Sequence, residues 1–267
     1  MPELPEVETV RRELEPWLVE RSIVGASHHP SAKFTAASDA VGTSIETVGR
    51  RGKYLLFGLD DGHEMVVHLG MTGRLRPATP TDDDDPHVRA RWNLDDGTTL
   101  EFSDIRRFGR IAVLPHGRYE TLPTLAALGP EPFDPAFEPA GFARALKASH
   151  RAIKTQLLSQ RPVAGVGNIY ADEALWEAEV NPSVRRLSAA RAARLHRTIR
   201  VVLQRGLDNH GTTLRDYRAP SGAQGRNQHA LRCYGRAGEP CERCGTPLRR
   251  KTIDARATTW CRACQAR

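Results

Sequence analysis

The sequence predicts an α+β protein of two domains, an N-terminal β-sandwich with a helix at its start and a helical C-terminal half that ends in a four-cysteine β-hairpin. Three observations lead to this class: short strand-like segments up to about residue 114, a cluster of prolines after them, and helical periodicity beyond that cluster. The chain has 267 residues, of which 39% are hydrophobic, enough for a substantial core in one large domain or two moderate ones.

A helix is predicted to begin near Pro5. Apolar residues recur at the spacing of one helix face, at Val7, Val10, Leu14 and Leu18. Proline is favourable in the first turn of a helix, and the carboxylates of Glu6 and Glu8 are favourable at the positive end of the helix dipole.

Residues 22–114 are predicted to form a β-sandwich or barrel, of which the sandwich is the class chosen here. Their segments are short and rich in Val, Leu and Phe, and two of them end at Asp60-Asp61-Gly62 and Asp95-Asp96-Gly97. Asp-Gly turns of this kind are typical of β-hairpins. The acidic run at residues 82–85 is interpreted as a solvated loop tip, because adjacent carboxylates lack the alternate spacing of a calcium loop.

Six prolines between residues 115 and 139 indicate a linker. Beyond it, helical periodicity predicts helices over residues 142–158, 168–178 and 188–207. The predicted boundaries are therefore residues 1–120 for the N-terminal domain, 121–135 for the linker, 136–220 for the helical domain and 221–267 for the C-terminal segment.

Charge and composition narrow the class of partner and the compartment. Lys and Arg outnumber Asp and Glu by 39 to 32, which gives a formal charge of +7 and favours a polyanionic partner such as nucleic acid. No apolar run approaches the roughly 20 residues that span a bilayer, and the start lacks a signal-peptide pattern. We therefore expect a cytosolic protein with no membrane partner.

The cysteine spacing predicts a metal site near the C-terminus. Cys241 and Cys244 form one CxxC pair, and Cys261 and Cys264 form a second pair, with sixteen residues between the two pairs. This is the spacing of a zinc ribbon, in which four thiolates hold a tetrahedral ion and leave no open position for catalysis. Two disulfides are the alternative, which a cytosolic location disfavours. Cys233 is interpreted as a small buried apolar residue.

Taken in order, seven segments make the chain resemble the bacterial formamidopyrimidine-DNA glycosylases. They are PELPEVET, RRGKYLL, HLGMTGRL, DIRRFGR, VAGVGNIYADEAL, YGRAGEPCERCG and ARATTWC. The resemblance covers essentially the whole chain. It implies a helix-two-turn-helix fold for the helical domain and a zinc finger with one structural zinc at the end. It also implies a monomer that removes oxidised purines from damaged double-stranded DNA and then cleaves the strand by β,δ-elimination.

The resemblance implies catalytic roles for Pro2, Glu3, Glu6 and Lys53. If Met1 is removed, Pro2 becomes a terminal secondary amine, and an α-amino group has a reference pKa of about 7.7–8.0, well below that of lysine. Such an amine can attack the sugar C1′ and form an iminium with the opened sugar. Glu3 then shuttles protons, Glu6 stabilises the cationic ring, and Lys53, expected on a strand, contacts a phosphate beside the lesion.

A second set of residues is implied to bind DNA. An enzyme that acts on a base inside a duplex must extrude it and fill the gap. Met71, Arg106 and Phe108 match the gap-filling residues, with Arg106 reading the orphaned base. Phosphate or other DNA contacts are implied for the remaining matched positions, His68, Lys154, Asn168 and Arg256.

The resemblance thins at residues 221–228, where a loop that closes over the extruded base is expected. Gly222 and Gly225 are present, but polar residues stand where an aromatic side chain is expected. Without a large apolar anchor the loop should have few buried contacts, so we expect it to be mobile without DNA.

Three alternatives remain open from the sequence. An endonuclease VIII-like relative would prefer oxidised pyrimidines, but its usual start has glycine in place of Leu4. A zinc-ribbon DNA-binding protein without catalysis would leave Pro2, Glu3 and Glu6 unexplained. A damage-sensing paralogue would bind lesions without turnover.

Overall fold

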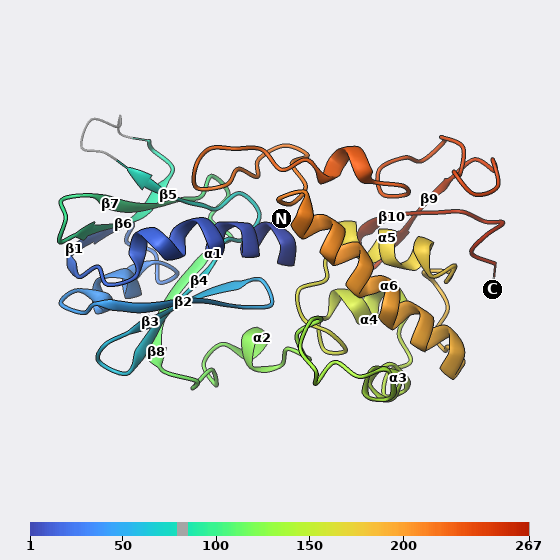
Figure 1. Ribbon diagram of the computed structural model, residues 1–267, viewed down its shortest axis with the longest axis horizontal. Coiled ribbons are helices and arrows are strands. Elements are labelled where there is room, and N and C mark those ends of the chain that lie inside the picture. The colour runs from blue at the N-terminus through green and yellow to red at the C-terminus, as the bar shows by residue number, and fades with distance from the viewer. Residues whose placement is uncertain (79–84, 267) are drawn as a thin grey trace. The chain divides into compact units, whose positions relative to one another are not determined.

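The computed structural model describes residues 1–78 and 85–266 (Figure 1), so most of the acidic run at 82–85 lies outside the described residues. The chain forms two compact units. Unit 1 comprises Met1–Ala126 and Asn209–Arg226, and unit 2 comprises Ala127–Asp208 and Asn227–Arg267. This division differs from the predicted boundaries because the chain returns to unit 1 after the last long helix. None of the described helices is both long and apolar enough to cross a membrane.

Unit 1 begins with helix α1 (Leu4–Leu18), which has proline in its first turn as predicted. Its described residues form two four-stranded antiparallel sheets. The first has the order β1 (Ile23–His28), β6 (Val88–Leu94), β7 (Thr99–Ser103), β5 (Arg74–Ala78). The second has the order β2 (Ile45–Arg51), β3 (Tyr54–Leu59), β4 (His63–His68), β8 (Arg110–Pro115). The 3-10 helix η1 (Thr35–Ala40) lies between β1 and β2 in the chain.

The two predicted hairpin turns are confirmed. Gly62 and Gly97, which join β3 to β4 and β6 to β7, both have φ of 82°, a left-handed conformation that glycine adopts at little cost. Register in each pair is set by the strand alternation, with Leu55 opposite Val67 and Trp92 opposite Leu100.

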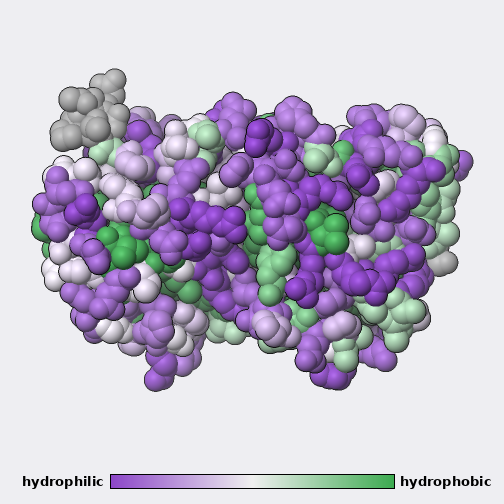
Figure 2. Space-filling view, viewed as in Figure 1, coloured by the Kyte–Doolittle hydropathy of each residue, from purple (hydrophilic) through white to green (hydrophobic). Residues whose placement is uncertain are grey.

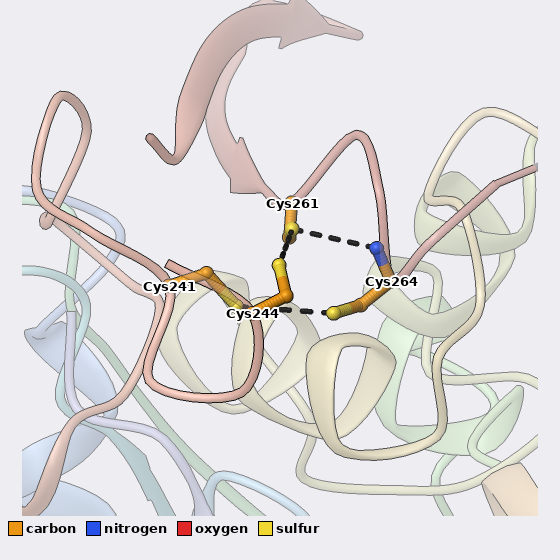
Figure 3. Close-up of side chains that lie close together, drawn as sticks. All are labelled: Cys241, Cys244, Cys261 and Cys264. Atoms are coloured by element: carbon orange, nitrogen blue, oxygen red, sulfur yellow. Dashed lines mark hydrogen bonds between the residues drawn. The ribbon is translucent and has the colours of Figure 1, made fainter. Parts of the chain in front are cut away.

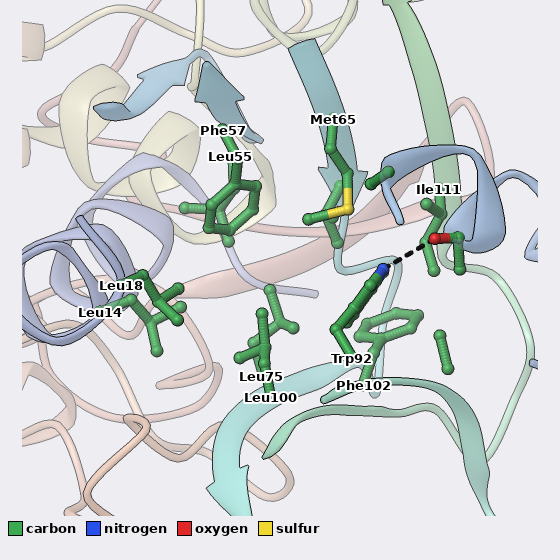
Figure 4. Packing of buried hydrophobic residues seen from close by; sticks show 14 of the residues in the cluster. Leu14, Leu18, Leu55, Phe57, Met65, Leu75, Trp92, Leu100, Phe102 and Ile111 are labelled. Atoms are coloured by element: carbon green, nitrogen blue, oxygen red, sulfur yellow. Dashed lines mark hydrogen bonds between the residues drawn. The ribbon is translucent and has the colours of Figure 1, made fainter. Parts of the chain in front are cut away.

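The core of unit 1 lies between its sheets and the buried face of α1 (Figure 4). Leu14 and Leu18 of the helix face Leu55 and Phe57 of β3 in one part of the cluster. The indole of Trp92 is fully buried, and its N–H donates to the carbonyl of Ala37 at 2.9 Å. The polar end of this large side chain is therefore satisfied within the apolar interior of the sandwich.

Unit 2 is mainly helical, with α5 at its centre. Its helices are α3 (Pro139–Lys147), α4 (Ile153–Leu158), α5 (Asn168–Glu177) and α6 (Ala189–Asp208). The helices predicted over 168–178 and 188–207 are confirmed as α5 and α6. Residues 169–176 of α5 are all buried, since α4, α6 and the terminal hairpin pack around the helix.

The single helix predicted over residues 142–158 is wrong. The structure has α3 and α4 with a break at residues 148–152. Within the break the Ser149 hydroxyl accepts the N–H of Arg151, and the Gln156 amide donates to the Arg151 carbonyl at 2.8 Å. Side chains thus take over backbone partners that a continuous helix would use. The predicted linker also contains a short helix, α2 (Pro123–Ala126).

The chain ends in a two-stranded hairpin, β9 (Arg249–Ile253) and β10 (Arg256–Trp260), after a short 3-10 helix, η2 (Asn227–Ala230). The turn between the strands places Asp254 and Ala255 at φ of 45° and 58°. Two consecutive left-handed residues make the tight turn that matches the twist of a hairpin.

Residues 221–224 and Arg226 are exposed, as expected for a loop with few buried contacts, and only Gly225 and Asn227 in this segment are buried. The N–H of Ser221 donates to the Glu13 carboxylate at 2.9 Å, and the N–H of Gly225 donates to the Thr213 hydroxyl at 2.9 Å. Gly225 is so close to Gly211 that an added Cβ would lie 2.1 Å from its carbonyl oxygen. Backbone packing therefore replaces the missing apolar anchor. The ordering of this loop around a lesion stays a prediction.

Candidate functional site

The start of α1 concentrates two buried carboxylates beside Pro2. Glu3 and Glu6 are only 2% and 1% exposed, and Pro2 is buried with them. Glu3 is the N-cap, and the Glu6 carboxylate accepts its backbone N–H at 2.7 Å, as part of a capping box. The predicted helix-start role and a chemical role for these residues are therefore compatible, because the capping bonds fix the carboxylates next to Pro2.

Glu6 is also held by the segment that returns to unit 1 after α6. Its Oε1 accepts the N–H of Thr212 at 2.6 Å, and Tyr217 donates its hydroxyl to the Glu6 carbonyl at 3.3 Å. Gly211 has φ of 82°, and a Cβ there would approach Glu6 Cγ to 2.9 Å. Sequence reasoning missed these three residues, because a glycine after a helix signals only where the helix ends.

With Met1 in place, the nitrogen of Pro2 is an amide nitrogen and the terminal amine belongs to Met1. Burial lowers the pKa of the Met1 amine, and the charge of Lys53 lowers it further, while Glu3 and Glu6 oppose the shift. A terminal amine in this place is therefore biased toward its unprotonated, nucleophilic form.

Lys53 lies in the two-residue turn between β2 and β3, which corrects its predicted place on a strand. Gly52, with φ of 57°, permits this turn. The Lys53 side chain is almost completely buried, and its charge acts on both the Met1 amine and His68. The structure thus brings Lys53 to the same side of unit 1 as the start of α1.

His68, at the end of β4, is partly buried and packs on Tyr54, with ring centroids 4.6 Å apart. Burial and the charge of Lys53 lower the pKa of His68 to about 4. Its Nδ1 accepts the N–H of Gly70 at 3.2 Å. The ring is therefore neutral near pH 7, and its proton is on Nε2, which makes Nε2 a hydrogen-bond donor.

Met71, Arg106 and Phe108 lie on two loops of unit 1. Met71 is partly exposed and Arg106 is exposed. Phe108 is 50% exposed, and the Arg106 guanidinium lies over its ring at 4.8 Å from the centroid. Neither Met71 nor Phe108 belongs to the buried core of unit 1. Ile105, 54% exposed on the same loop, was missed.

Lys154 does not face solvent. Its side chain is fully buried, and Nζ lies 2.6 Å from Asp172 Oδ1. The ammonium also donates to the Ala257 carbonyl at 3.0 Å and to the Thr258 hydroxyl at 2.9 Å. Burial raises the pKa of Asp172 to about 6, although Lys154 opposes the shift. Lys154 therefore joins helix α4 to the hairpin strand β10.

Asn168 is the first residue of α5, following Gly165 (φ 81°) and Gly167 in a turn, as predicted. Its amide Nδ2 donates to the Ala257 carbonyl at 3.1 Å, so one of its two amide hydrogens is used inside unit 2. On the same helix, the Glu173 carboxylate accepts the backbone N–H groups of residues 232–234. Helix α5 thus binds the hairpin strand β10 through Asn168 and the segment before the hairpin, residues 232–234, through Glu173.

Arg256 is exposed at the start of β10, directly after the tight turn. The next two residues, Ala257 and Thr258, are the ones that Lys154 binds. The predicted placement near the hairpin tip is confirmed. The buried end of the strand is fixed to the helices while its arginine is displayed to solvent.

The four predicted ligand cysteines converge from two segments of the chain (Figure 3). Their Sγ atoms all lie within 4.8 Å of one another, with Cys241 to Cys264 at 4.0 Å and Cys244 to Cys261 at 3.6 Å. A tetrahedral zinc with bonds of about 2.3 Å sets its sulfur atoms about 3.8 Å apart. The geometry therefore fits one structural zinc ion, with no position left open.

Cys233 is fully buried and separate from the ligand set. Its thiol donates to the Thr259 carbonyl at 3.1 Å, and burial raises its pKa. Its interpretation as a buried small side chain is confirmed.

Three domain families match the sequence in order. Residues 1–111 match the formamidopyrimidine-DNA glycosylase N-terminal domain, residues 128–218 match the formamidopyrimidine-DNA glycosylase H2TH domain, and residues 238–267 match the zinc finger found in FPG and IleRS. Because these matches cover most of the chain, the protein belongs to the formamidopyrimidine-DNA glycosylase family.

Individual relatives agree over the full length. The formamidopyrimidine-DNA glycosylase of Deinococcus radiodurans is 44% identical, over 99% of this chain and 97% of its own. The crystal structure of the MutM (Fpg) protein of Thermus thermophilus is 45% identical with a TM-score of 0.92, covering 99% and 98% of the two chains. A Lactococcus lactis Fpg variant in complex with Fapy-dG-containing DNA is 34% identical with a TM-score of 0.90 over both complete chains.

Proposed function

We propose that the protein is a bifunctional DNA glycosylase and abasic-site lyase of base excision repair, acting on 8-oxoguanine and formamidopyrimidines in duplex DNA. The observation that carries the proposal is the start of α1, where Pro2 adjoins the buried carboxylates of Glu3 and Glu6. A terminal amine beside buried carboxylates suits nucleophilic attack on a sugar carbon and the proton transfers that accompany it. Similarity to a relative bound to Fapy-dG-containing DNA supports the substrate class.

In the proposed reaction, removal of Met1 frees the Pro2 nitrogen as a secondary amine. The amine attacks C1′ of the extruded nucleotide, and the glycosidic electron pair leaves with the base. The nitrogen, positively charged after the attack, gives up its proton, and the departing base takes up one proton in balance. Glu3 donates a proton to the ring oxygen as the sugar opens, and the nitrogen lone pair forms the iminium. Glu6 accepts the N–H groups of Glu3 and Thr212, so it positions the site and stabilises the cation.

Strand cleavage follows from the iminium. The positive nitrogen acidifies the C2′ proton, and loss of that proton expels the 3′ phosphate oxygen in β-elimination. A second elimination expels the 5′ phosphate. Lys53 and the Nε2–H of neutral His68 are proposed to bind phosphates beside the lesion, where a charge-assisted and a neutral hydrogen bond orient the strand.

The remaining surface residues are proposed to bind the duplex. Met71 and Phe108 fill the gap, and Arg106 hydrogen-bonds to the base left without a partner. Arg256 and the second amide hydrogen of Asn168 contact phosphates. The face seen in Figure 2 is mostly hydrophilic, with hydrophobic residues only in small separate patches, which suits a partner bound through phosphates.

Lys154 is proposed to act indirectly, by fixing the strand that carries Arg256. Residues 221–228 are proposed to contact the extruded base through backbone groups and amides, because their side chains are polar. We further infer a monomer with a cytoplasmic, nucleoid-associated location. The catalytic role falls to residues 1–120, and residues 136–220 and 221–267 hold the DNA.

Borohydride trapping tests the proposed function. Pure protein is incubated with a duplex containing 8-oxoguanine opposite cytosine in the presence of borohydride, which reduces an iminium to a stable amine. A covalent protein–DNA adduct is expected, and peptide mapping should place it on Pro2. Binding without an adduct would favour a DNA-binding or damage-sensing protein, and an adduct only with oxidised pyrimidines would favour an endonuclease VIII-like enzyme.

Intact-mass measurement tests the state of the N-terminus. The active preparation should lack Met1, because a small second residue permits removal of the initiator methionine. A fully active preparation that retains Met1 would rule out Pro2 as the nucleophile.

A further inference from the structure

Two loops of unit 1 carry the three residues proposed to fill the gap in the duplex. Residues 69–73 join β4 to β5 and carry Met71, while residues 104–109 join β7 to β8 and carry Arg106 and Phe108. Inserting a side chain into a base stack is less favourable if its loop becomes ordered only at that moment, because ordering the loop costs conformational entropy. The contacts that hold these loops in place should therefore affect how readily the base is extruded.

The second loop begins with a fully buried carboxylate, Asp104. Its Oδ1 accepts the N–H of Arg106 at 3.2 Å, and its Oδ2 accepts the N–H of Gly109 at 2.7 Å. The two oxygens therefore hold the backbone on both sides of Phe108. Asp104 is itself fixed, since its carbonyl accepts the Arg89 Nε–H at 2.9 Å and its N–H donates to the His87 carbonyl at 2.9 Å.

Thr72 joins the first loop to the same carboxylate. Its hydroxyl donates to Asp104 Oδ1 at 2.5 Å and accepts the N–H of Arg106 at 3.1 Å. Thr72 directly follows Met71 and is itself buried. The hydroxyl of Thr72 thus connects the loop of Met71 to the backbone of Arg106.

Two glycines let the loops lie this close together. Gly70 has φ of 65°, and a Cβ there would lie 2.5 Å from the backbone nitrogen of Gly109. A Cβ on Gly109 would in turn lie 3.0 Å from the His68 carbonyl oxygen. The backbone of one loop therefore packs directly on that of the other, and the loops share one support.

We propose that Asp104 and Thr72 are positioning residues that hold Met71, Arg106 and Phe108 as one preorganised wedge, an inference that rests on the proposed function. The side chains of the pair hydrogen-bond within the two loops themselves, to each other and to the N–H groups of Arg106 and Gly109, so the pair acts on extrusion and on reading of the opposite base. Losing the Thr72 hydroxyl leaves the Asp104 carboxylate and the Arg106 N–H each one buried partner short. The wedge then has to be ordered during each encounter.

The test compares three threonine variants. Thr72→Val removes the hydroxyl with little change in shape, and Thr72→Ser keeps it. Thr43→Val is the matched control, because Thr43 is also buried in unit 1 and donates one side-chain hydrogen bond, to the Ala40 carbonyl at 2.8 Å. Asp104→Asn, which keeps the side-chain shape, is a fourth variant that tests the carboxylate itself.

Three rates are measured under single-turnover conditions with saturating protein. They are excision of 8-oxoguanine opposite cytosine, excision opposite adenine, and strand cleavage at a preformed abasic site, which has no base to extrude. Thr72→Val should slow excision opposite cytosine by about tenfold, the rate equivalent of one buried hydrogen bond. It should also reduce the cytosine-to-adenine ratio and leave abasic cleavage within about twofold of the parent. Asp104→Asn should act in the same direction, and Thr72→Ser should restore the parent rates.

The outcomes separate this inference from the proposed function. A parent protein that does not excise 8-oxoguanine would refute the proposed function itself. An active parent, with Thr72→Val and Thr43→Val alike in all three rates, would overturn the positioning role. Equal loss of excision and abasic cleavage in Thr72→Val would also overturn it, because that pattern indicates general destabilisation, which thermal unfolding of both valine variants measures independently.

Discussion

The loop that carries Arg106 and the hairpin that carries Arg256 are built in a similar way. Each exposes an arginine, and in each a buried charged side chain hydrogen-bonds to the nearby backbone. In unit 1, the carboxylate of Asp104 accepts N–H groups from the loop. In unit 2, the ammonium of Lys154 donates to the carbonyl and hydroxyl oxygens of β10. The charged side chain in each segment is therefore opposite in sign to the partial charges of the atoms it binds: a carboxylate binds N–H groups, and an ammonium binds oxygen atoms.

The two supports differ in what they require. Asp104 is satisfied by a hydroxyl and backbone N–H groups, whereas Lys154 needs the counterion Asp172 and a strand whose far end is fixed by four cysteines. The loop should therefore be independent of metal, and the hairpin should depend on both the metal and the ion pair. This difference predicts that a substitution can disable one of the two segments proposed to contact DNA without affecting the other.

The largest effect is expected from Cys244→Ser. The variant should lose its zinc and weaken DNA binding, because structural zinc contributes on the order of 10 kcal/mol to the folding of small zinc modules. Metal analysis and binding to lesion duplex measure both effects. Cys233→Ala, which removes a buried thiol outside the ligand set, should retain zinc. If Cys244→Ser binds and cleaves lesion DNA as the parent does, the hairpin has no role in binding.

Breaking the buried ion pair comes next. Lys154→Met should lower the free energy of unfolding of unit 2 by about 3–5 kcal/mol, because it leaves Asp172 buried without a counterion. Denaturant unfolding measures this loss. Arg151→Met is the control: its pair with Asp254 is exposed, so about 1 kcal/mol or less is expected. Similar losses in the two variants would contradict a supporting role for Lys154.

Arg106→Ala tests the wedge without disturbing its support. The variant should excise 8-oxoguanine more slowly and should lose about 1–3 kcal/mol of discrimination between opposite cytosine and adenine, the range for one specific base contact. Excision rates on the two duplexes give the ratio. Arg107→Ala removes a neighbouring exposed charge and should keep the parent ratio. An unchanged ratio in Arg106→Ala would refute the reading role.

The smallest effect is expected from Arg256→Ala, which removes one proposed phosphate contact and should leave the zinc site intact. DNA affinity should fall, and the slope of log affinity against log salt should become shallower by about one unit. Arg250→Ala on the neighbouring strand loses the same charge and should change the slope less. Equal slopes in Arg256→Ala and the parent would show that Arg256 does not contact phosphate.

Local patterns were sufficient for several features. The CxxC pairs predicted the metal site because ligand spacing is set by short knuckles, and Gly62 and Gly97 predicted two hairpin turns because few other residues adopt their φ. The burial of Lys154 could not be predicted, for the opposite reason. A lysine on a short helix normally faces water, and only the packing of β10 against α4 and α5 explains its burial.

The sequence by itself determined the class of fold, the zinc ligands, the family and the start of helix α1 near Pro5. Each of these depends on residue type and short spacing. The tertiary structure alone decided which distant residues hydrogen-bond to the residues of the site. It brought Thr212 onto Glu6 from 206 positions away and joined Thr72 to Asp104 across 32. Such contacts form where separate segments meet, and the burial that makes them strong arises only when the chain has folded.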